Sequence, residues 1–143
     1  MTQHILSISD CEATVQLLKK AAKRASENAY APYSNFPVGA AVLTEDGEIY
    51  TGANVENASY GLTICAERNA IFQAIAKGTR RIRALAIYTP TQSSTPPCGA
   101  CRQVLNEFGP DTDVYSTCNT TETLHYKLSD LLPKAFGPGN LEE

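Results

Sequence analysis

The sequence predicts an α/β fold, a three-layer α-β-α sandwich built on a mixed five-stranded sheet. Two observations lead to this prediction. Segments with helical spacing of apolar residues alternate along the chain with short apolar segments of strand character, in the order α-β-β-α-β-α-β-β. No segment has the composition of a linker, and a length of 143 residues suits one domain, so residues 1–143 are expected to form a single domain.

The first half of the chain predicts a helix and a hairpin. Ser9 and Glu12 stand three residues apart, which is typical of a capping box, and apolar residues recur at helical spacing after them. A proline-containing break at 31–34 follows this helix. Apolar segments on either side of Asp46-Gly47, a dipeptide typical of two-residue hairpin turns, predict two antiparallel strands.

The second half predicts two further helices with strands between and after them. Thr63 is a suitable N-cap for the second helix and Gly78 a suitable end, while Pro97 suits the first position of the third helix. In chain order, the predicted elements are a helix over 10–29, strands over 38–43 and 49–55, a helix over 65–77, a strand over 85–88, a helix over 98–108, strands over 114–117 and 124–127, and a helical turn over 128–132.

The charge of the chain argues against a nucleic-acid partner. The formal net charge is −3, whereas a long nucleic acid requires a basic face that displaces counterions from its phosphates. The basic cluster Lys77, Arg80, Arg81 and Arg83 lacks the interleaved aromatic residues of a stacking surface, and we interpret it as a solvated connection. We therefore expect a small-molecule substrate.

Composition also predicts where the protein works. No apolar segment approaches the roughly 18 residues of a membrane span, and the N-terminal segment lacks the pattern of a secretory signal. The chain has five cysteines, and an odd count without such a signal indicates a reducing compartment, where metal binding is favoured over disulfides. We expect a cytoplasmic protein, or one also found in the nucleus if its source is eukaryotic, with no membrane partner.

Three cysteines have the spacing of a catalytic zinc site. Cys98 and Cys101 stand at i and i+3, so one helical turn places both sulfurs on the same face, and Cys65 supplies a third sulfur from the start of another helix. Zinc prefers four tetrahedral ligands, and a catalytic site keeps one of these positions for water. The two histidines lie in no such motif, so three thiolates leave that position open.

Two other interpretations of the cysteines remain open. A structural zinc site normally closes with four ligands, and Cys118 could supply the fourth sulfur or be a small core residue. A redox Cys-x-x-Cys pair is the second interpretation, but it leaves Cys65 and Glu67 unexplained.

Two charged residues follow Cys65 closely. Glu67 lies near the expected metal without being an expected ligand, and we predict that it moves protons between water and substrate. Taken alone, it is better explained as an exposed glutamate that the helix dipole stabilises, and the three zinc-type cysteines beside it reverse this preference. Arg68 is predicted either to hydrogen-bond the ligand sulfurs and offset their charge, or to be a surface arginine.

These motifs resemble those of a known family. A Cys or His two residues before a Glu, followed by Pro-Cys-x-x-Cys, is typical of zinc base deaminases. Over nearly its full length, the chain resembles the small cytidine deaminases, and the three-cysteine type forms homotetramers. The resembling segments are Ala31-Pro32-Tyr33-Ser34-Asn35-Phe36-Pro37-Val38-Gly39-Ala40, Asn54-Val55-Glu56-Asn57-Ala58-Ser59-Tyr60-Gly61, Cys65-Ala66-Glu67-Arg68, 97–103 and Leu131-Leu132-Pro133-Lys134-Ala135-Phe136. The resemblance implies a cytidine deaminase-like catalytic domain, one Zn²⁺ per subunit and a homotetramer.

The resemblance also implies substrate-binding residues. The matching positions are Phe36, Asn54, Glu56, Tyr60, Ala66 and Phe136. In the family, the residues matching Asn54 and Glu56 hydrogen-bond the ribose hydroxyls, and positions i and i+2 of a strand do share a face. The residue matching Phe36 packs against the pyrimidine, and those matching Tyr60 and Phe136 approach a neighbouring subunit's pocket. The alternatives are a polar strand exit, a core phenylalanine and packing within one subunit.

The expected reaction is zinc-dependent hydrolytic deamination of cytidine and deoxycytidine to uridine and deoxyuridine, in pyrimidine salvage. A zinc-bound hydroxide is expected to attack C4 of the base while Glu67 serves as the proton shuttle. A deaminase of a nucleoside antibiotic such as blasticidin S is the nearest alternative, against which Asn54 and Glu56 favour an ordinary ribose. A polynucleotide deaminase is disfavoured by the acidic charge, and a non-catalytic zinc module would need four closed ligands.

Overall fold

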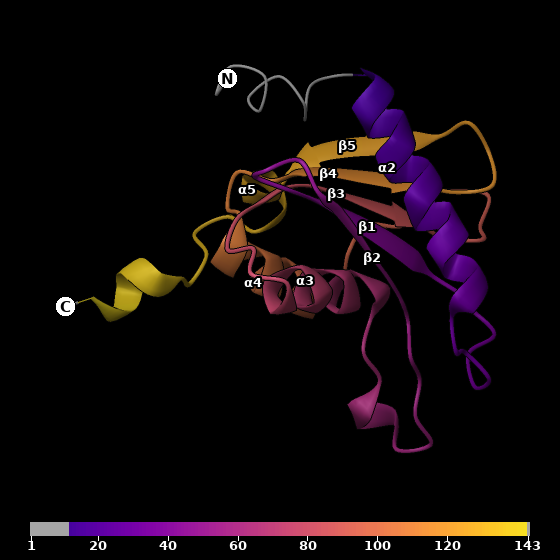
Figure 1. The fold of residues 1–143 in the computed structure, drawn as a ribbon. Helices are drawn as coiled ribbons and strands as arrows, with labels where there is room; N and C mark the ends of the chain where they lie inside the picture. Colours follow the sequence, from indigo (N-terminus) through magenta and orange to yellow (C-terminus); the bar gives the residue numbers. More distant parts are fainter. Residues whose placement is uncertain (1–11, 143) are drawn as a thin grey trace.

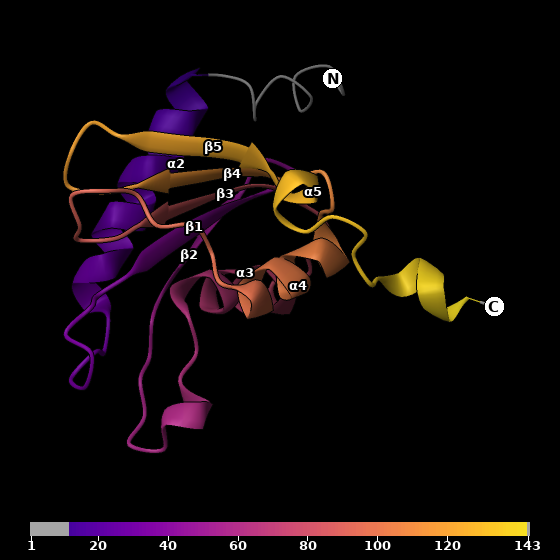
Figure 2. The same cartoon turned by 180° about the vertical axis from the view of Figure 1, so that it is seen from behind.

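The computed structural model describes residues 12–142. Its elements in chain order are α2 Glu12–Ala25, η1 Ser26–Asn28, β1 Gly39–Thr44, β2 Ile49–Ala53, η2 Tyr60–Leu62, α3 Ala66–Ala76, β3 Ile82–Tyr88, α4 Gly99–Phe108, β4 Asp113–Thr117, β5 Thr123–Lys127, α5 Leu128–Leu131 and η3 Pro138–Leu141. The strands form one sheet in the order β2-β1-β3-β4-β5. Helix α2 crosses one face of this sheet, and α3 and α4 lie against the other (Figures 1 and 2). The predicted α-β-α sandwich with five strands is confirmed.

One parallel pair makes the sheet mixed. Strand β1 pairs antiparallel with β2 and β3, and β4 pairs antiparallel with β5, whereas β3 and β4 run parallel. Parallel neighbours need a crossover connection, which α4 provides. The carboxyl ends of β3 and β4 therefore share one edge of the sheet, and the segments 89–97 and 118–122 leave the sheet together there.

Apolar side chains fill both layers between the sheet and the helices. On the α3 and α4 side, Ile71 and Leu105 pack with Leu85, and on the α2 side Leu18 packs with Leu43. Strand β3 lies in the middle of the sheet and is buried on both faces. This position explains why its sequence is almost continuously apolar instead of alternating.

Two predicted elements end earlier than expected. The first helix, predicted over 10–29, ends as an α-helix at Ala25 and continues as the single 3₁₀ turn η1. The second strand, predicted over 49–55, ends at Ala53 because the side chains that follow it bond to the segment before β1. The capping residue predicted at Ser9 lies outside the described residues.

The hairpin between β1 and β2 is present, but its turn is wider than two residues. The amide of Thr44 donates to the carbonyl of Glu48, and the amide of Gly47 donates back to the carbonyl of Thr44. Gly47 has a φ of 88°, a left-handed conformation that glycine adopts without strain. The Asp46-Gly47 dipeptide therefore predicted the position of the hairpin correctly, but the loop is longer than the predicted two residues.

The two predicted helices over 65–77 and 98–108 begin within one residue of the predicted position, but the residues predicted to cap or open them are wrong. The N-cap of α3 is Cys65 instead of Thr63, and the N-cap of α4 is Cys98, so Pro97 precedes the cap instead of occupying the first helical position. The chain thus enters each of these helices through a cysteine. Gly78 follows the end of α3 as predicted, with a φ of 104°.

Candidate metal centre and active-site cavity

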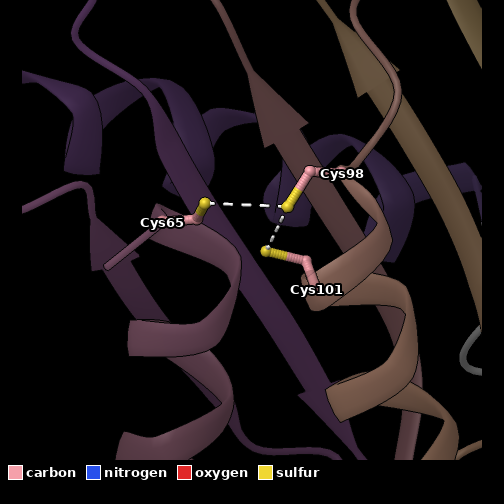
Figure 3. A group of neighbouring side chains, drawn as sticks. All are labelled: Cys65, Cys98 and Cys101. Atoms are coloured by element: carbon pink, nitrogen blue, oxygen red, sulfur yellow. Dashed lines mark hydrogen bonds between the residues drawn. The ribbon is translucent and has the colours of Figure 1, made fainter. Parts of the chain in front are cut away.

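Three cysteine sulfurs meet between the N-termini of α3 and α4 (Figure 3). Cys65 and Cys98 are the N-cap residues, and Cys101 lies in the first turn of α4. The Sγ atoms of Cys65 and Cys98 are 3.8 Å apart, those of Cys98 and Cys101 are 3.6 Å apart, and all three lie within 4.8 Å of one another. The structure thus brings together the three cysteines that the sequence analysis grouped.

The spacing and chemistry of these sulfurs suit zinc. Zinc–sulfur bonds of about 2.3 Å in a tetrahedron place neighbouring sulfurs about 3.8 Å apart. The two contacts, at 3.8 and 3.6 Å, match this separation, and all three cysteines are free thiols. Helix N-termini also stabilise the anionic thiolates that zinc requires. Cys65, Cys98 and Cys101 are therefore the residues that would hold the metal.

Cys118 does not join this cluster. Its Sγ lies 3.1 Å from the hydroxyl of Thr120 and 3.5 Å from the carbonyl of Gln92, on the loops beyond β3 and β4. Among residues 12–142, the three-cysteine cluster is the one group of three or more metal-ligating side chains that could share an ion. The geometry therefore gives no support to the four-sulfur structural site that the sequence left open.

Arg68 lies beside the sulfurs and not on the open surface. Its Nη2 donates to the Sγ of Cys65 at 3.4 Å, and this contact raises the pKa of the guanidinium. A hydrogen bond from Cys101, together with bonds from Arg68 and Cys98, lowers the pKa of the Cys65 thiol to about 5. The pKa of Cys101 is raised, because its proton is held against the Cys65 sulfur. Arg68 therefore offsets part of the negative charge of the cluster.

The carboxyl group of Glu67 is buried beside the cluster, with 5% of the residue exposed. Its pKa is raised to about 7, mainly because burial disfavours the charged form. A hydrogen bond from its own backbone amide lowers the pKa, and the negative charge of Cys65 raises it further. A carboxyl group with a pKa near neutrality can both accept and return a proton at physiological pH. This placement excludes the exposed, dipole-stabilised glutamate considered from the sequence.

A cavity of about 380 Å³ opens beside the sulfurs. This volume lies within the range of about 300–1,000 Å³ that is typical of small-molecule sites. The wall includes two of the cysteines, Glu67 and four residues that the resemblance assigned to substrate binding. These residues are Cys65, Cys98, Glu67, Phe36, Asn54, Glu56 and Ala66. The cavity therefore joins the metal cluster to most of the predicted substrate-binding residues.

Asn54 and Glu56 point to the same side of the chain. Both are buried, whereas Val55 between them is 50% exposed, as the alternation of an extended segment requires. The amide of Asn54 ties down the segment before β1, since its Oδ1 accepts from the amide of Val38 at 2.9 Å and its Nδ2 donates to the carbonyl of Phe36 at 3.0 Å. Asn54 therefore positions the backbone that carries Phe36.

Glu56 anchors the same segment from its other end. Its Oε1 accepts from the backbone amides of Tyr33 at 3.0 Å and Ser34 at 3.1 Å, and its Oε2 accepts from the hydroxyl of Ser34. The hydrogen bond from the Ser34 hydroxyl is the largest influence on the Glu56 carboxyl group and lowers its pKa. An ionised carboxylate has about four acceptor positions, so three of them are used and one remains for a ligand.

Tyr60 and Phe136 lie at the periphery. Tyr60 is 74% exposed and lines a second cavity of about 250 Å³, which shares Ser34, Glu56 and Thr63 with the first. Phe136 is 58% exposed and is absent from the described lining of both cavities. Within one described chain, the structure therefore brings Tyr60 near the site and leaves Phe136 away from it.

Several cavity residues had no individual prediction. They are Ser34, Val38, Thr63, Ile87, Thr89, Thr95 and Pro96. Ser34 and Val38 lie within the segment 31–40, whose resemblance already indicated functional importance. Thr95 and Pro96 lie between the strand predicted over 85–88 and the helix predicted over 98–108, in a segment for which no function was predicted. The available signal was their position immediately before a predicted metal ligand.

A close helix–strand contact positions the N-terminus of α3. A Cβ atom on Gly52 would lie 2.4 Å from the amide nitrogen of Ala70 and 2.6 Å from the carbonyl oxygen of Ala66. The side chain of Asn69 adds a hydrogen bond of 2.8 Å to the carbonyl of Ala53. Only a glycine on β2 allows α3 to lie this close, and this contact sets the height of Cys65 and Glu67 over the sheet.

Comparisons with known proteins agree with this geometry. The zinc-binding region of cytidine and deoxycytidylate deaminases matches residues 12–117. A cytidine deaminase of Halalkalibacterium halodurans is 52% identical over 122 residues, which are 85% of this chain and 92% of that protein. The chain belongs to the cytidine deaminase family.

Further relatives support this membership. A cytidine deaminase of Sporosarcina psychrophila is 47% identical over 128 residues, 89% of this chain and 94% of that one. The crystal structure of cytidine deaminase from Burkholderia pseudomallei is similar with a TM-score of 0.82 and 51% identity, covering 85% of this chain and 98% of the other. The predicted family and fold are confirmed, and membership makes the chain a hydrolytic deaminase with a zinc-binding domain. In the part of the chain that the structure describes, no helix is long and apolar enough to cross a membrane.

Proposed function

We propose that this cytidine deaminase family member hydrolyses cytidine and deoxycytidine to uridine and deoxyuridine with release of ammonia. One observation supports this most strongly: a cluster of three thiols at tetrahedral spacing, two of which line the cavity, lies beside a buried carboxyl group that lines the same cavity. Neither the cysteines nor the glutamate alone would specify this chemistry, since each has a structural interpretation.

Cys65, Cys98 and Cys101 would hold one Zn²⁺ per subunit. The bound zinc supplies Lewis acidity, which lowers the pKa of a water molecule to near neutrality. Arg68 limits the negative charge that three thiolates bring to the metal, through its contact with Cys65. Two of the cysteines line the cavity and the third is buried, so a metal ion held by the three sulfurs would lie at the cavity wall.

Glu67 moves the protons of the reaction. With a pKa of about 7, its carboxylate accepts a proton from the attacking water and delivers it to N3 of the pyrimidine as the C4–O bond forms. It then takes the second proton of the water and gives it to the departing amino group, so that the C4–N bond breaks and ammonia leaves. Glu67 ends the cycle in its starting protonation state.

Residues of the cavity wall would bind the pyrimidine ring and the sugar of the nucleoside. The ring of Phe36 packs against the pyrimidine, and Ala66 provides a small apolar surface beside it. The remaining acceptor position of the Glu56 carboxylate accepts a hydrogen bond from a sugar hydroxyl. Asn54 acts with Glu56 at the sugar. Among the described lining residues of both cavities, none is Lys, Arg or His, so a nucleoside is favoured over a nucleotide that carries a phosphate.

Two exposed aromatic residues support an assembly. Tyr60 and Phe136 lie on η2 and close to η3, the segments that extend away from the sheet in Figures 1 and 2. Large exposed apolar side chains on protruding segments are typical of contact surfaces. We propose a homotetramer in which these two residues approach neighbouring cavities, and a cytoplasmic role in pyrimidine salvage.

The test is a substrate panel with the purified protein. Cytidine, deoxycytidine, deoxycytidylate, blasticidin S and a single-stranded oligonucleotide are each followed by ammonia release, with and without a zinc chelator. The proposal requires turnover of cytidine and deoxycytidine that chelation abolishes and added zinc restores. Turnover of the oligonucleotide or the antibiotic in preference to cytidine would overturn it.

A further inference from the structure

Two loops that leave the sheet together meet next to the cavity. The segment 89–97 follows β3, contributes Thr89, Thr95 and Pro96 to the cavity wall, and leads directly into Cys98. The segment 118–122 follows β4 and contributes no residue to the described cavity lining. The parallel pairing of β3 and β4 places the two segments side by side.

Hydrogen bonds tie residues 89–94 to the end of β4 and to the segment that follows it. The amide of Thr89 donates to the carbonyl of Thr117 (3.1 Å), and the amide of Asn119 donates to the carbonyl of Thr91 (2.9 Å). The hydroxyl of Thr120 donates to the carbonyl of Gln92 (3.0 Å). Ser94 makes two further bonds to Glu122: its amide donates to Oε1 (3.0 Å) and its hydroxyl donates to the carbonyl (3.0 Å). Glu122 thus receives both donors of the buried Ser94, while its own side chain is on the surface.

The fixed position of Ser94 is passed on to Cys98 by a stiff connection. Two prolines, Pro96 and Pro97, lie between them, and each proline fixes its own φ and restricts the residue before it. The far end of the connection is also held, because the guanidinium of Arg102 donates to the carbonyl of Pro97 at 2.8 Å and to that of Leu131 at 2.8 Å. Few backbone dihedral angles between Ser94 and Cys98 are therefore free to rotate, so a displacement of Ser94 also displaces Cys98.

We propose that Glu122 is a positioning residue of the active site, which fixes Ser94 and thereby sets where Thr95, Pro96 and Cys98 stand on the cavity wall. Glu122 touches neither the metal cluster nor the cavity. Its side-chain oxygen accepts a hydrogen bond from the backbone amide of Ser94. The role therefore needs an acceptor oxygen at this place, and the negative charge of the Glu122 carboxylate is secondary. The expected effect of Glu122 on substrate binding rests on the proposed function. Its expected effect on metal retention does not.

The test uses the full-length zinc-loaded protein and four variants. Glu122→Ala removes the acceptor, Glu122→Gln keeps an oxygen at the same place, and Glu107→Ala removes an exposed carboxylate on α4 as a charge-matched control. The rate of zinc transfer to a colorimetric chelator is measured without substrate, and kcat and KM are measured with cytidine. Ser94→Ala keeps the bond from the backbone amide to Glu122 and removes the bond from the Ser94 hydroxyl to the Glu122 carbonyl, so it tests separately whether holding residue 94 matters.

The loss of one hydrogen bond at the surface predicts that Glu122→Ala releases zinc roughly three- to tenfold faster and raises KM by a similar factor. Ser94→Ala is expected to shift both quantities in the same direction, whereas Glu122→Gln and Glu107→Ala remain within about twofold of the wild type. The proposal is overturned if Glu122→Ala behaves like Glu107→Ala in both measurements, or if Glu122→Gln is as impaired as Glu122→Ala. A wild-type protein that retains zinc but does not turn over cytidine would contradict the proposed function, while the zinc-transfer comparison would still decide the role of Glu122.

Discussion

The two sides of the active-site cavity are built differently. The metal side consists of the first turns of α3 and α4, packed on the sheet, where Glu67 and Cys101 are almost fully buried. The other side, here called the rim, consists of loop residues that include Phe36, Asn54 and Glu56. Tyr60, which lines the adjoining second cavity, is 74% exposed on a segment that extends away from the sheet (Figure 1). The groups to which we assign the chemistry thus lie on helices packed against the sheet, while the proposed substrate contacts lie on loops held by Asn54 and Glu56.

This difference has a consequence for mutation. Changes on the metal side are expected to alter kcat, metal retention or folding, because its side chains are buried and support one another. Changes on the rim are expected to alter KM and to leave the fold intact, because the rim loops contribute little to the core.

The largest expected effect is on the metal side, from Glu67→Gln. The amide keeps the size of the side chain but cannot take a proton from water, so kcat should fall by about 10²–10⁴-fold. Zinc content, measured by elemental analysis, should remain equal to that of the wild type. A variant with near-normal kcat would remove Glu67 from the proton-transfer role.

The next effect tests how closely α3 is seated on β2. A methyl group from Gly52→Ala would overlap the backbone of α3, so the free energy of unfolding should fall by roughly 1–3 kcal/mol. Urea denaturation of the zinc-loaded protein measures this change. Gly139→Ala is the control, because a Cβ atom there meets no atom within 4 Å. Equal midpoints for the two variants would show that the close contact at Gly52 is not needed.

On the rim, Glu56→Gln is expected to raise KM for cytidine about tenfold with little change in kcat. The variant loses the charged acceptor for a sugar hydroxyl and weakens the bonds to Tyr33 and Ser34. Steady-state kinetics with cytidine and with a 2′,3′-dideoxy analogue separate these contributions. A larger loss for the analogue than for cytidine would contradict the sugar-binding role.

The smallest effect concerns the pH dependence of the rim. The pKa of Glu56 lies below its ordinary value of 4.5, so its contribution to stability and binding is complete above 4.5 and is lost as the pH falls through the lowered pKa. Ser34→Ala removes the largest cause of this lowering. The acid-side rise in KM should therefore begin at a higher pH in the variant than in the wild type. Superimposable pH profiles of KM would show that the Ser34 hydroxyl does not set this pKa.

The same division explains how much could be predicted from the sequence. The metal side was predictable because its ligands occur in two short motifs, Cys65-Ala66-Glu67 and 97–101, whose helical spacing fixes their geometry. The residues at the helix starts were wrong because ordinary preferences point to Thr63 as a cap and to Pro97 as a first helical residue, whereas Cys65 and Cys98 take the cap positions.

The contacts that hold the segment before Cys98 were less predictable because they join segments that are distant in the sequence. Nothing in the local sequence of 89–97 or 118–122 indicates that Ser94 meets Glu122, since that contact follows from the parallel pairing of β3 and β4. The 3₁₀ turns η2 and η3 were missed for a related reason. They are too short for a periodic pattern, and their apolar residues remain exposed in the described chain.

The central claim is that three protein sulfurs hold a zinc ion whose remaining position faces the cavity. Zinc K-edge X-ray absorption on the purified, zinc-loaded protein measures the ligand set directly. Three sulfurs at about 2.3 Å and one lighter oxygen or nitrogen ligand at about 2.0 Å are expected. A shell of four sulfurs would contradict the claim, because it would close the position that the chemistry requires.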